Sequence, residues 1–214
     1  MQLRHLAYVF IFAGLNAAAF PSTPEEAIRP IQDQWAEIKY RIPAKQQAER
    51  YHVLAEQARQ LAATQPGHAE ALIWEGIALS SEAGAKGGLG ALSIAKAAKQ
   101  QLEAAIKLDD KALKGSAYTS LGTLYFKVPG WPIGFGDKTR AEELLKKALA
   151  INPDGIDPNY FYADYLAERE RYSEALRYLD TALKAPSRPG REVADSGRRQ
   201  EIQALIAKVK KDME

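Results

Sequence analysis

The chain of 214 residues contains no cysteine. That absence excludes disulfide bonds, thiolate nucleophiles and cysteine-ligated zinc together. It also removes a point of lipid attachment beside the apolar N-terminal segment. Cysteine-free chains occur in oxidising and in reducing compartments, so this absence does not locate the protein.

Histidine and recognisable catalytic motifs are scarce as well. Of three histidines, His5 lies in the N-terminal segment, while His52 and His68 have no partner at metal-ligand spacing. The segments "GGLG" and "GFGDK" lack the strand before and the Lys-Ser/Thr after them that a phosphate-binding loop needs. We therefore expect no enzymatic activity, no metal and no cofactor. The alternative in the enzyme class is a helical hydrolase built around His52 or His68.

An excess of one charge is also missing. Lysine and arginine exceed aspartate and glutamate by only 29 − 27 = +2, and no long block of one sign occurs. Because phosphate contacts require a basic patch, we expect no nucleic-acid partner.

The first residues, "MQLRHLAYVFIFAGLNAAAF", have the layout of a secretory signal. Arg4 precedes an apolar run from Leu6 to Leu15, and small residues follow at 17–19. A run of ten apolar residues is about half of the roughly 20 that span a bilayer. We expect a signal peptide over residues 1–19, cleaved near Ala19, and a periplasmic or secreted mature chain without a membrane span. A signal that is retained as an anchor is the alternative.

The chain is rich instead in self-similarity with a period of 34 residues. The segments "AEELLKKALAINP" and "SEALRYLDTALKAP" align Ala141 with Ala175 and Leu145 with Leu179. The related segments "AKQQLEAAIKLDD" and, more faintly, "LAEQARQLAATQP" come earlier. Three of these copies are preceded by the patterns "LIWEGIAL", "YTSLGTLY" and "NYFYADYL", each with a small residue near its centre.

These two patterns resemble the tetratricopeptide repeat family, in which two antiparallel helices, A and B, form each 34-residue unit. The small residue on helix A, at Gly76, Gly122 and Ala163, would let helix B approach closely. The resemblance implies an all-α, TPR-like α-solenoid of about four helical hairpins with a C-terminal capping helix.

The repeat divides the chain into segments. We expect a divergent N-terminal pair over 24–66, repeats over 69–112, 115–154 and 156–187, and a capping helix over 191–213. One face of the capping helix would cover the last repeat, with the residues Ile202, Leu205, Ile206 and Val209. At the start of the last repeat, Asp157 is expected to cap a helix whose first residue is Pro158.

Two hairpins contain extra residues between their helices. In the family pattern the small residue of helix A lies twelve positions before the first alanine of helix B, as Ala163 and Ala175 do. The second repeat exceeds this spacing by ten residues, around 82–93, and the third by seven, in "VPGWPIGFGDK". Because a solenoid places every A-to-B turn on one edge, we expect the two insertions on the same rim. Insertions on one face are often where a solenoid binds.

Two surfaces compete for a protein partner. The first is the third-repeat insertion, with Pro129, Trp131, Pro132, Ile133 and Phe135. Ordering this loop costs on the order of 10 kcal/mol or more, so its rings should be buried, either on the solenoid itself or on a partner.

The second surface is the concave groove along the A helices. The family register places groove residues at Ile73, Ile77, Phe126, Lys127, Tyr160, Asp164 and Glu168, together with Glu70, Ser116, Thr119 and Thr123. The Lys, Arg and Asn clamp with which some family members bind a peptide carboxylate is mostly missing. Asp164 and Glu168 repel each other, so either a basic partner or a nearby arginine, Arg169 or Arg171, should balance them.

A narrower resemblance follows from the signal, the irregular helical pairs and "GDKTRAEELLKKAL" after a Pro-Gly loop. Over about residues 70–185, this combination is similar to the T-component proteins of tripartite ATP-independent periplasmic (TRAP) transporters. That similarity implies an accessory protein that docks a solute-binding protein and allows a homo-oligomer, although this chain lacks the lipidated cysteine. The function expected from the sequence is an exported, non-catalytic TPR scaffold for an unidentified protein partner, with the transporter accessory role as the alternative.

Overall fold

The computed structural model describes residues 23–214, which form nine α-helices and no β-strand. The expected signal peptide lies outside these residues. In chain order the helices are α1 (Pro24–Arg41), α2 (Ala44–Thr64), α3 (Ala69–Lys86), α4 (Gly88–Leu108), α5 (Ala112–Lys127), α6 (Lys138–Ile151), α7 (Ile156–Glu168), α8 (Tyr172–Lys184) and α9 (Glu192–Asp212). Within this part of the chain, no helix is both long and apolar enough to cross a bilayer.

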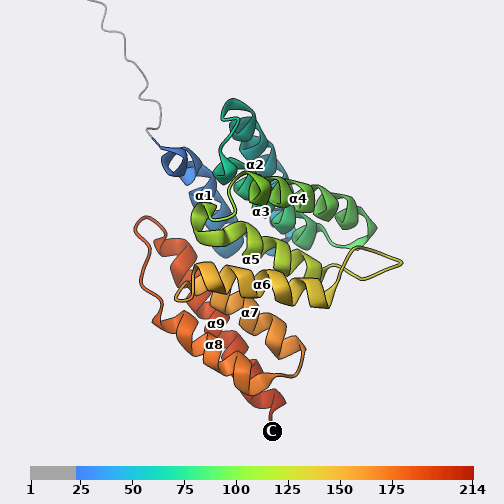
Figure 1. Ribbon diagram of the computed structural model, residues 1–214, viewed down its shortest axis with the longest axis vertical. Helices are drawn as coiled ribbons and strands as arrows, with labels where there is room; N and C mark the ends of the chain where they lie inside the picture. The colour runs from blue at the N-terminus through green and yellow to red at the C-terminus, as the bar shows by residue number, and fades with distance from the viewer. Residues whose placement is uncertain (1–22) are drawn as a thin grey trace, which may run out of the picture.

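Eight of the helices pair as consecutive hairpins, α1–α2, α3–α4, α5–α6 and α7–α8, which stack along the molecule (Figure 1). The first helices of the hairpins contact one another in the order α1, α3, α5 and α7, and so form an inner layer. The predicted all-α solenoid of four hairpins with a final helix is confirmed.

Close approach within the hairpins depends on the small residues of the repeat. A methyl group on Gly76 of α3 would lie 2.6 Å from Cγ of Leu102 in α4, and one on Gly122 of α5 would lie 2.8 Å from Cγ of Leu145 in α6. Both leucines are fully buried. The prediction that these glycines let the two helices of a hairpin approach closely is therefore confirmed, because a larger residue would push the helices apart.

The extra residues of the second repeat form helix rather than an extended turn. Helix α3 continues to Lys86 and α4 begins at Gly88, so only Gly87 joins them. Gly87 and Gly88 have φ angles of +62° and +63°, which glycine adopts without steric cost. The expectation that the additional length lies in the turn is wrong here, because both helices grow by extra turns around a one-residue connection.

The extra residues of the third repeat do form a loop, here called the rim loop (residues 128–137). Backbone hydrogen bonds close it on itself: Gly134 N donates to Gly130 O (3.1 Å), Gly136 N to Pro129 O (2.9 Å). The loop also approaches the preceding hairpin, since a methyl group on Gly134 would lie 3.3 Å from Cδ1 of Leu92 in α4. The two insertions therefore lie on the same rim, as predicted, and Figure 1 shows the α3–α4 turn beside the loop.

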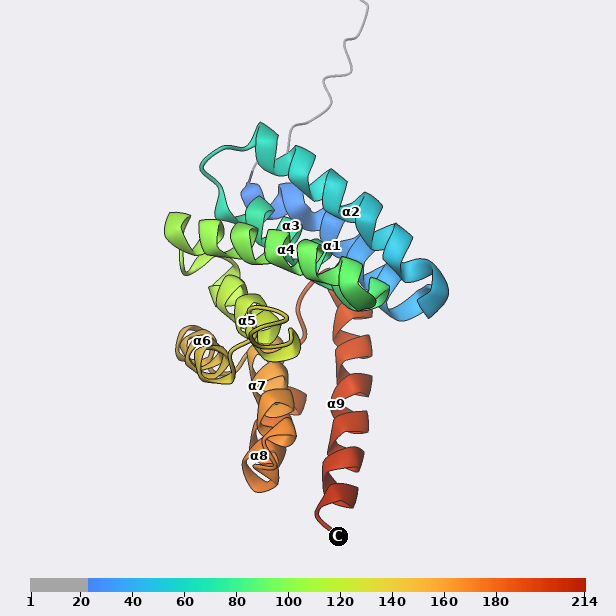
Figure 2. The same cartoon turned by 90° about the vertical axis from the view of Figure 1, so that its right-hand side faces the viewer.

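Helix α9 does more than cap the last repeat. Its C-terminal half buries Ile202 and Val209 against α7 and α8, as the sequence predicts. Its N-terminal half reaches back to α1, where Glu201 accepts a hydrogen bond from the Tyr40 hydroxyl (3.2 Å) and pairs with Lys39 (3.2 Å). Gly197 lies directly against the Tyr40 ring. The last helix therefore joins the first hairpin to the last one, and Figure 2 shows it beside α7 and α8.

Candidate functional site

The rim loop presents two large apolar side chains to solvent. The side chain of Trp131 is 90% exposed and that of Ile133 is 65% exposed, and Pro129 and Pro132 are exposed as well. Phe135 differs, because it is half-buried and packs edge-on against Tyr125 of α5, with ring centroids 5.6 Å apart. One ring of the loop is thus folded back on the solenoid, while the Trp131 ring is not buried.

Lys99 of α4 strengthens the attachment of the loop. Its Nζ lies 5.7 Å from the centroid of the Phe135 ring and 5.8 Å from that of Tyr125. Such cation–π contacts contribute about 0.5–1 kcal/mol at exposed sites. The anchor of the rim loop therefore includes a residue of the second repeat as well as the third.

The concave side contains a cavity of about 1250 Å³, bordered by α1, α2, α3, α5, α7, α9 and the segments before α7 and α9. The predicted groove residues that border it are Ile77, Ser116, Thr119, Thr123, Lys127, Tyr160 and Asp164. Ile73 and Phe126 do not, since both are buried in the cores between helices. The predicted register is wrong at these two positions, which point from the inner helices toward their neighbours. Glu70 and Glu168 also lie outside the cavity wall.

The like charges of Asp164 and Glu168 are balanced within the chain. Nζ of Lys127, on α5, lies 2.8 Å from Asp164 and 2.5 Å from Glu168. Burial alone would lower the pKa of Lys127, but Asp164 and Glu168 outweigh it and raise the pKa, so the ammonium stays charged. The balancing cation is therefore Lys127 and not Arg169 or Arg171.

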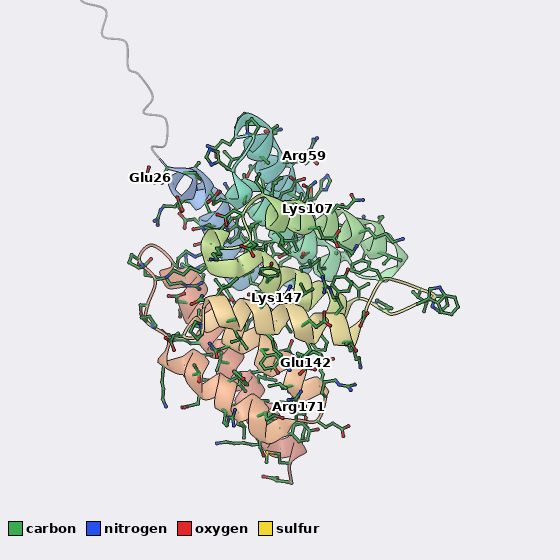
Figure 3. The ribbon with its side chains drawn as sticks, in the orientation of Figure 1. Glu26, Arg59, Lys107, Glu142, Lys147 and Arg171 are labelled. Atoms are coloured by element: carbon green, nitrogen blue, oxygen red, sulfur yellow. The ribbon has the colours of Figure 1, made fainter. Side chains whose placement is uncertain are left out.

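Arg171, which immediately precedes α8, has other partners. Its guanidinium bonds to Glu174 of α8 (2.7 Å) and to Glu142 of α6 (3.0 Å), and Figure 3 shows Arg171 and Glu142 on neighbouring hairpins. Lys146 also pairs with Glu142 (2.8 Å). A hydrogen bond from Lys146 is the main reason that the pKa of Glu142 falls to about 2. This cluster fixes the third repeat to the fourth on the outer side of the stack.

Asp157, at the start of α7, is the centre of an ion network. Its carboxylate accepts from Nη1 of Arg188 (2.7 Å) and from Nε of Arg198 (2.9 Å). Arg188 also pairs with Asp195 (2.6 Å), and Arg198 with Glu201 (2.6 Å). The expected helix cap is wrong, because α7 is preceded by Gly155 and the carboxylate bonds to arginines instead.

The arginine charges set the protonation of Asp157. Burial alone would raise the pKa of its carboxyl, but Arg198 and Arg188 outweigh burial and lower the pKa to about 2. Asp157 is therefore charged at neutral pH.

Aromatic side chains of the first hairpins border the end of the cavity beside α1 and α9. This aromatic end is formed by Trp35 and Tyr40 of α1, Tyr51 of α2 and Trp74 of α3. The Trp35 ring centroid lies 6.0 Å from that of Tyr40 and 6.1 Å from that of Trp74. The repeat pattern does not predict this aromatic end, because the first hairpin departs from the pattern and α9 is expected only as a cap. The segment "SRPGREVADSGRR" contained a signal, since four arginines and two glycines are unusual in a segment that only covers an apolar edge.

The two candidate histidines lie apart from these features. His52 of α2 has a partner that its sequence spacing does not indicate, since its Nδ1 lies 3.1 Å from Oε1 of Glu82 in α3. His68 immediately precedes α3, where its side chain makes no capping bond.

The family profile and one solved structure with a TM-score above 0.5 agree with this architecture. The sequence profile of the tetratricopeptide repeat family matches residues 133–190. Seven solved chains match the structure. A thermophilic TPR protein of Thermus thermophilus does so with a TM-score of 0.57 and 16% sequence identity, over 86% of this chain and 87% of the other. PilF of Pseudomonas aeruginosa matches with a TM-score of 0.36 and 16% identity, over 86% of this chain and 89% of the other. No curated protein matches the sequence.

The stacked hairpins define a helical repeat solenoid. The family profile matches the part of the solenoid from the rim loop through α6, α7 and α8, so this part of the chain is similar to tetratricopeptide repeats and the fold is TPR-like.

Proposed function

We propose that the protein is a non-catalytic scaffold that binds a protein partner through the rim loop. The observation that carries this proposal is the side chain of Trp131, which is 90% exposed on a loop closed by its own hydrogen bonds. Tryptophan is enriched among the residues that dominate binding energy at protein interfaces. Solenoids of this architecture commonly act through insertions on one face.

The energetics favour the rim loop as a docking element. Burying a tryptophan side chain removes about 150–250 Å² of surface from water, which corresponds to roughly 4–6 kcal/mol at about 25 cal/mol per Å². Because Phe135 already anchors the loop on Tyr125, little of that gain is lost to ordering the backbone. The groove is the less favoured surface for a protein, because Lys127 is paired within the chain and α9 borders the cavity.

Removing the exposed side chains is expected to abolish capture of the partner without unfolding the protein. In a double variant, Trp131→Ala with Ile133→Ala, crosslinking and pull-down should recover at least tenfold less partner. The melting temperature should change by less than about 2 °C, since neither side chain is buried. The partner is identified by mass spectrometry and its affinity is measured with purified protein.

Leu108→Ala is the matched control, because Leu108 is an exposed apolar residue at the end of α4. It should capture the partner as the parent does. Unchanged capture by the double variant would refute the docking role of the loop. A solute-binding protein as the captured partner would favour the accessory role in a TRAP-type transporter, which stays a prediction.

We also propose that the scaffold acts in the periplasm or outside the cell, on the basis of the N-terminal pattern of residues 1–19. Expression of the full chain followed by cell fractionation should recover the protein outside the cytoplasm. Sequencing of the mature N-terminus should give Phe20 as the first residue. Recovery of the intact chain in the cytoplasm would contradict export.

A further inference from the structure

We propose that the aromatic end of the concave cavity binds a small organic carboxylate with an aromatic or apolar body, and that Arg191 holds its carboxylate group. This site lies on the concave side and not on the rim loop, so it is independent of the proposed docking function.

Arg191 differs from the other cations that border this end of the cavity. Within residues 23–214, its guanidinium forms no ion pair and donates no hydrogen bond, and Nη1 is covered from solvent. The guanidinium carbon lies 5.1 Å from the centroid of the Trp74 ring. A largely covered guanidinium without an anion is unfavourable, because water no longer solvates the charge.

The ion pairs of the adjoining network do not include Arg191. Three cations of the adjoining network, Lys39, Arg188 and Arg198, face three carboxylates, Asp157, Asp195 and Glu201. Arg191 adds a fourth cation. One guanidinium outside every ion pair matches a monoanion such as a carboxylate better than a doubly charged phosphate.

The electrostatic environment of Arg191 disfavours its positive charge. Burial and then the charge of Arg188 lower the pKa of Arg191, while Asp157, Asp195 and the exposed Asp33 of α1 partly offset them. Arginine nevertheless remains protonated in proteins, so the cost falls on the charged form. A bound anion would relieve this cost.

Two further polar groups without partners belong to residues that border the same cavity as Arg191. Tyr51 is 1% exposed and Trp74 is 5% exposed, and neither the Tyr51 hydroxyl nor the Trp74 Nε1 has a hydrogen-bond partner in the described part of the chain. Both groups are donors, as is a guanidinium. An acceptor-rich ligand head would satisfy these donors, and because all three atoms are covered in the free protein, its binding requires small shifts of the side chains that cover them.

The remainder of the aromatic end would contact the body of the ligand. The Trp35 and Trp74 rings meet edge to face here, and Ile77 adds an aliphatic side chain. Ligand pockets typically occupy about 300–1000 Å³ and combine apolar walls with a few polar groups. The cavity of about 1250 Å³ has room for such a ligand at one end.

The distribution of tryptophan gives a direct test. The chain has three tryptophans, Trp35 and Trp74 at the aromatic end and Trp131 on the rim loop. In a Trp131→Phe background, intrinsic fluorescence therefore reports on the aromatic end alone. The probes are phenylacetate, 4-phenylbutyrate and decanoate, each compared with its uncharged amide, with inorganic phosphate and with a short peptide that has a free C-terminus.

We expect at least one of these carboxylates to bind with a Kd below about 1 mM and its amide to bind at least tenfold more weakly. Arg191→Gln should lower the affinity at least tenfold, and Arg191→Lys by less. The control Arg50→Gln, an exposed arginine of α2, should leave the affinity unchanged. Tyr51→Phe should weaken binding severalfold without lowering the melting temperature of the free protein, because its hydroxyl has no partner to lose.

Several results would overturn the proposal. The first is that none of the carboxylates binds, or that a carboxylate and its amide bind equally well. The second is that Arg191→Gln and Arg50→Gln bind the carboxylate with equal affinity. The third is that phosphate binds as tightly as the carboxylates, or that only the peptide binds. The comparison of acid with amide needs no variant, so it decides the matter even if Arg191→Gln does not fold. Loss of partner capture on changing Trp131 and Ile133 has no bearing on these outcomes.

Discussion

Replacing Asp157 by alanine is expected to lower the free energy of unfolding by about 2–3 kcal/mol. The substitution removes the carboxylate that Arg188 and Arg198 share, and Arg198 is buried. Breaking a buried ion pair from one side typically costs about 3–5 kcal/mol, and the partial exposure of Asp157 reduces that cost. For a chain of this size, the melting temperature should fall by roughly 4–12 °C.

The same substitution should also loosen α9 from α1. Hydrogen exchange is expected to become faster in the N-terminal half of α9 and in the C-terminal half of α1, while the α5–α6 hairpin keeps its protection. The control is Asp180→Ala, which breaks an exposed pair with Lys184 on α8. Exposed pairs contribute about 0–1 kcal/mol, so equal losses in the two variants would contradict a central role of Asp157.

The contribution of Asp157 should depend on pH in a defined direction. Its pKa is lowered to about 2 in the folded protein, so its stabilising effect is present above the usual carboxyl pKa near 4. That effect is lost as the pH falls from about 4 toward 2. The difference in stability between the parent and Asp157→Asn should therefore be constant from pH 7 to about pH 5 and should shrink below pH 4.

The second large effect is expected from Gly122→Ala. The added methyl group would lie 2.8 Å from Cγ of Leu145 and 3.2 Å from the backbone oxygen of Ala141, both on α6. Overpacking of this kind typically costs about 1–3 kcal/mol, which should exceed the gain of about 1 kcal/mol in helix propensity. Thermal and chemical unfolding should show a net loss of about 1–2 kcal/mol.

Gly84→Ala is the matched control for Gly122→Ala. Gly84 lies inside α3, and a methyl group there would meet no atom within 4 Å. The same chemical change should therefore raise stability by about 0.5–1 kcal/mol. If both variants gain stability, the α5–α6 hairpin does not depend on the close approach at Gly122.

The pairing of the helices into hairpins could be predicted from the sequence. A spacing of 34 residues separates Ala141 from Ala175 and Leu145 from Leu179. This spacing is enough to predict which helices pair, because each helix of a repeat packs mainly on helices close to it in the chain. The same rule predicted that the two insertions share a rim. It did not predict how the second insertion folds, since Gly87 alone supplies the turn that twelve residues were expected to form.

The concave side could be predicted only in part, because it depends on contacts between distant segments. Ile77, Lys127, Tyr160 and Asp164 follow from the helical register. Arg191 and the ion network do not, since they require α9 to fold back on α1.

Gly197 was a usable signal for that contact. Glycine inside a helix costs about 1 kcal/mol unless something approaches closely, and here the Tyr40 ring does. The rim loop was a different case, because composition alone could not tell which ring, Phe135 or Trp131, would be the anchor.

The contact of α9 with α1 has a consequence for how the repeat number can vary. In an open stack, a unit can be added or deleted and the two ends simply move apart or together. Here Glu201 must reach Lys39 and Tyr40 across the whole series of hairpins, so any change in their number would separate these residues. The architecture is therefore expected to exist at one length, and evolution can lengthen individual helices or loops, as in the second and third repeats, but not the series itself.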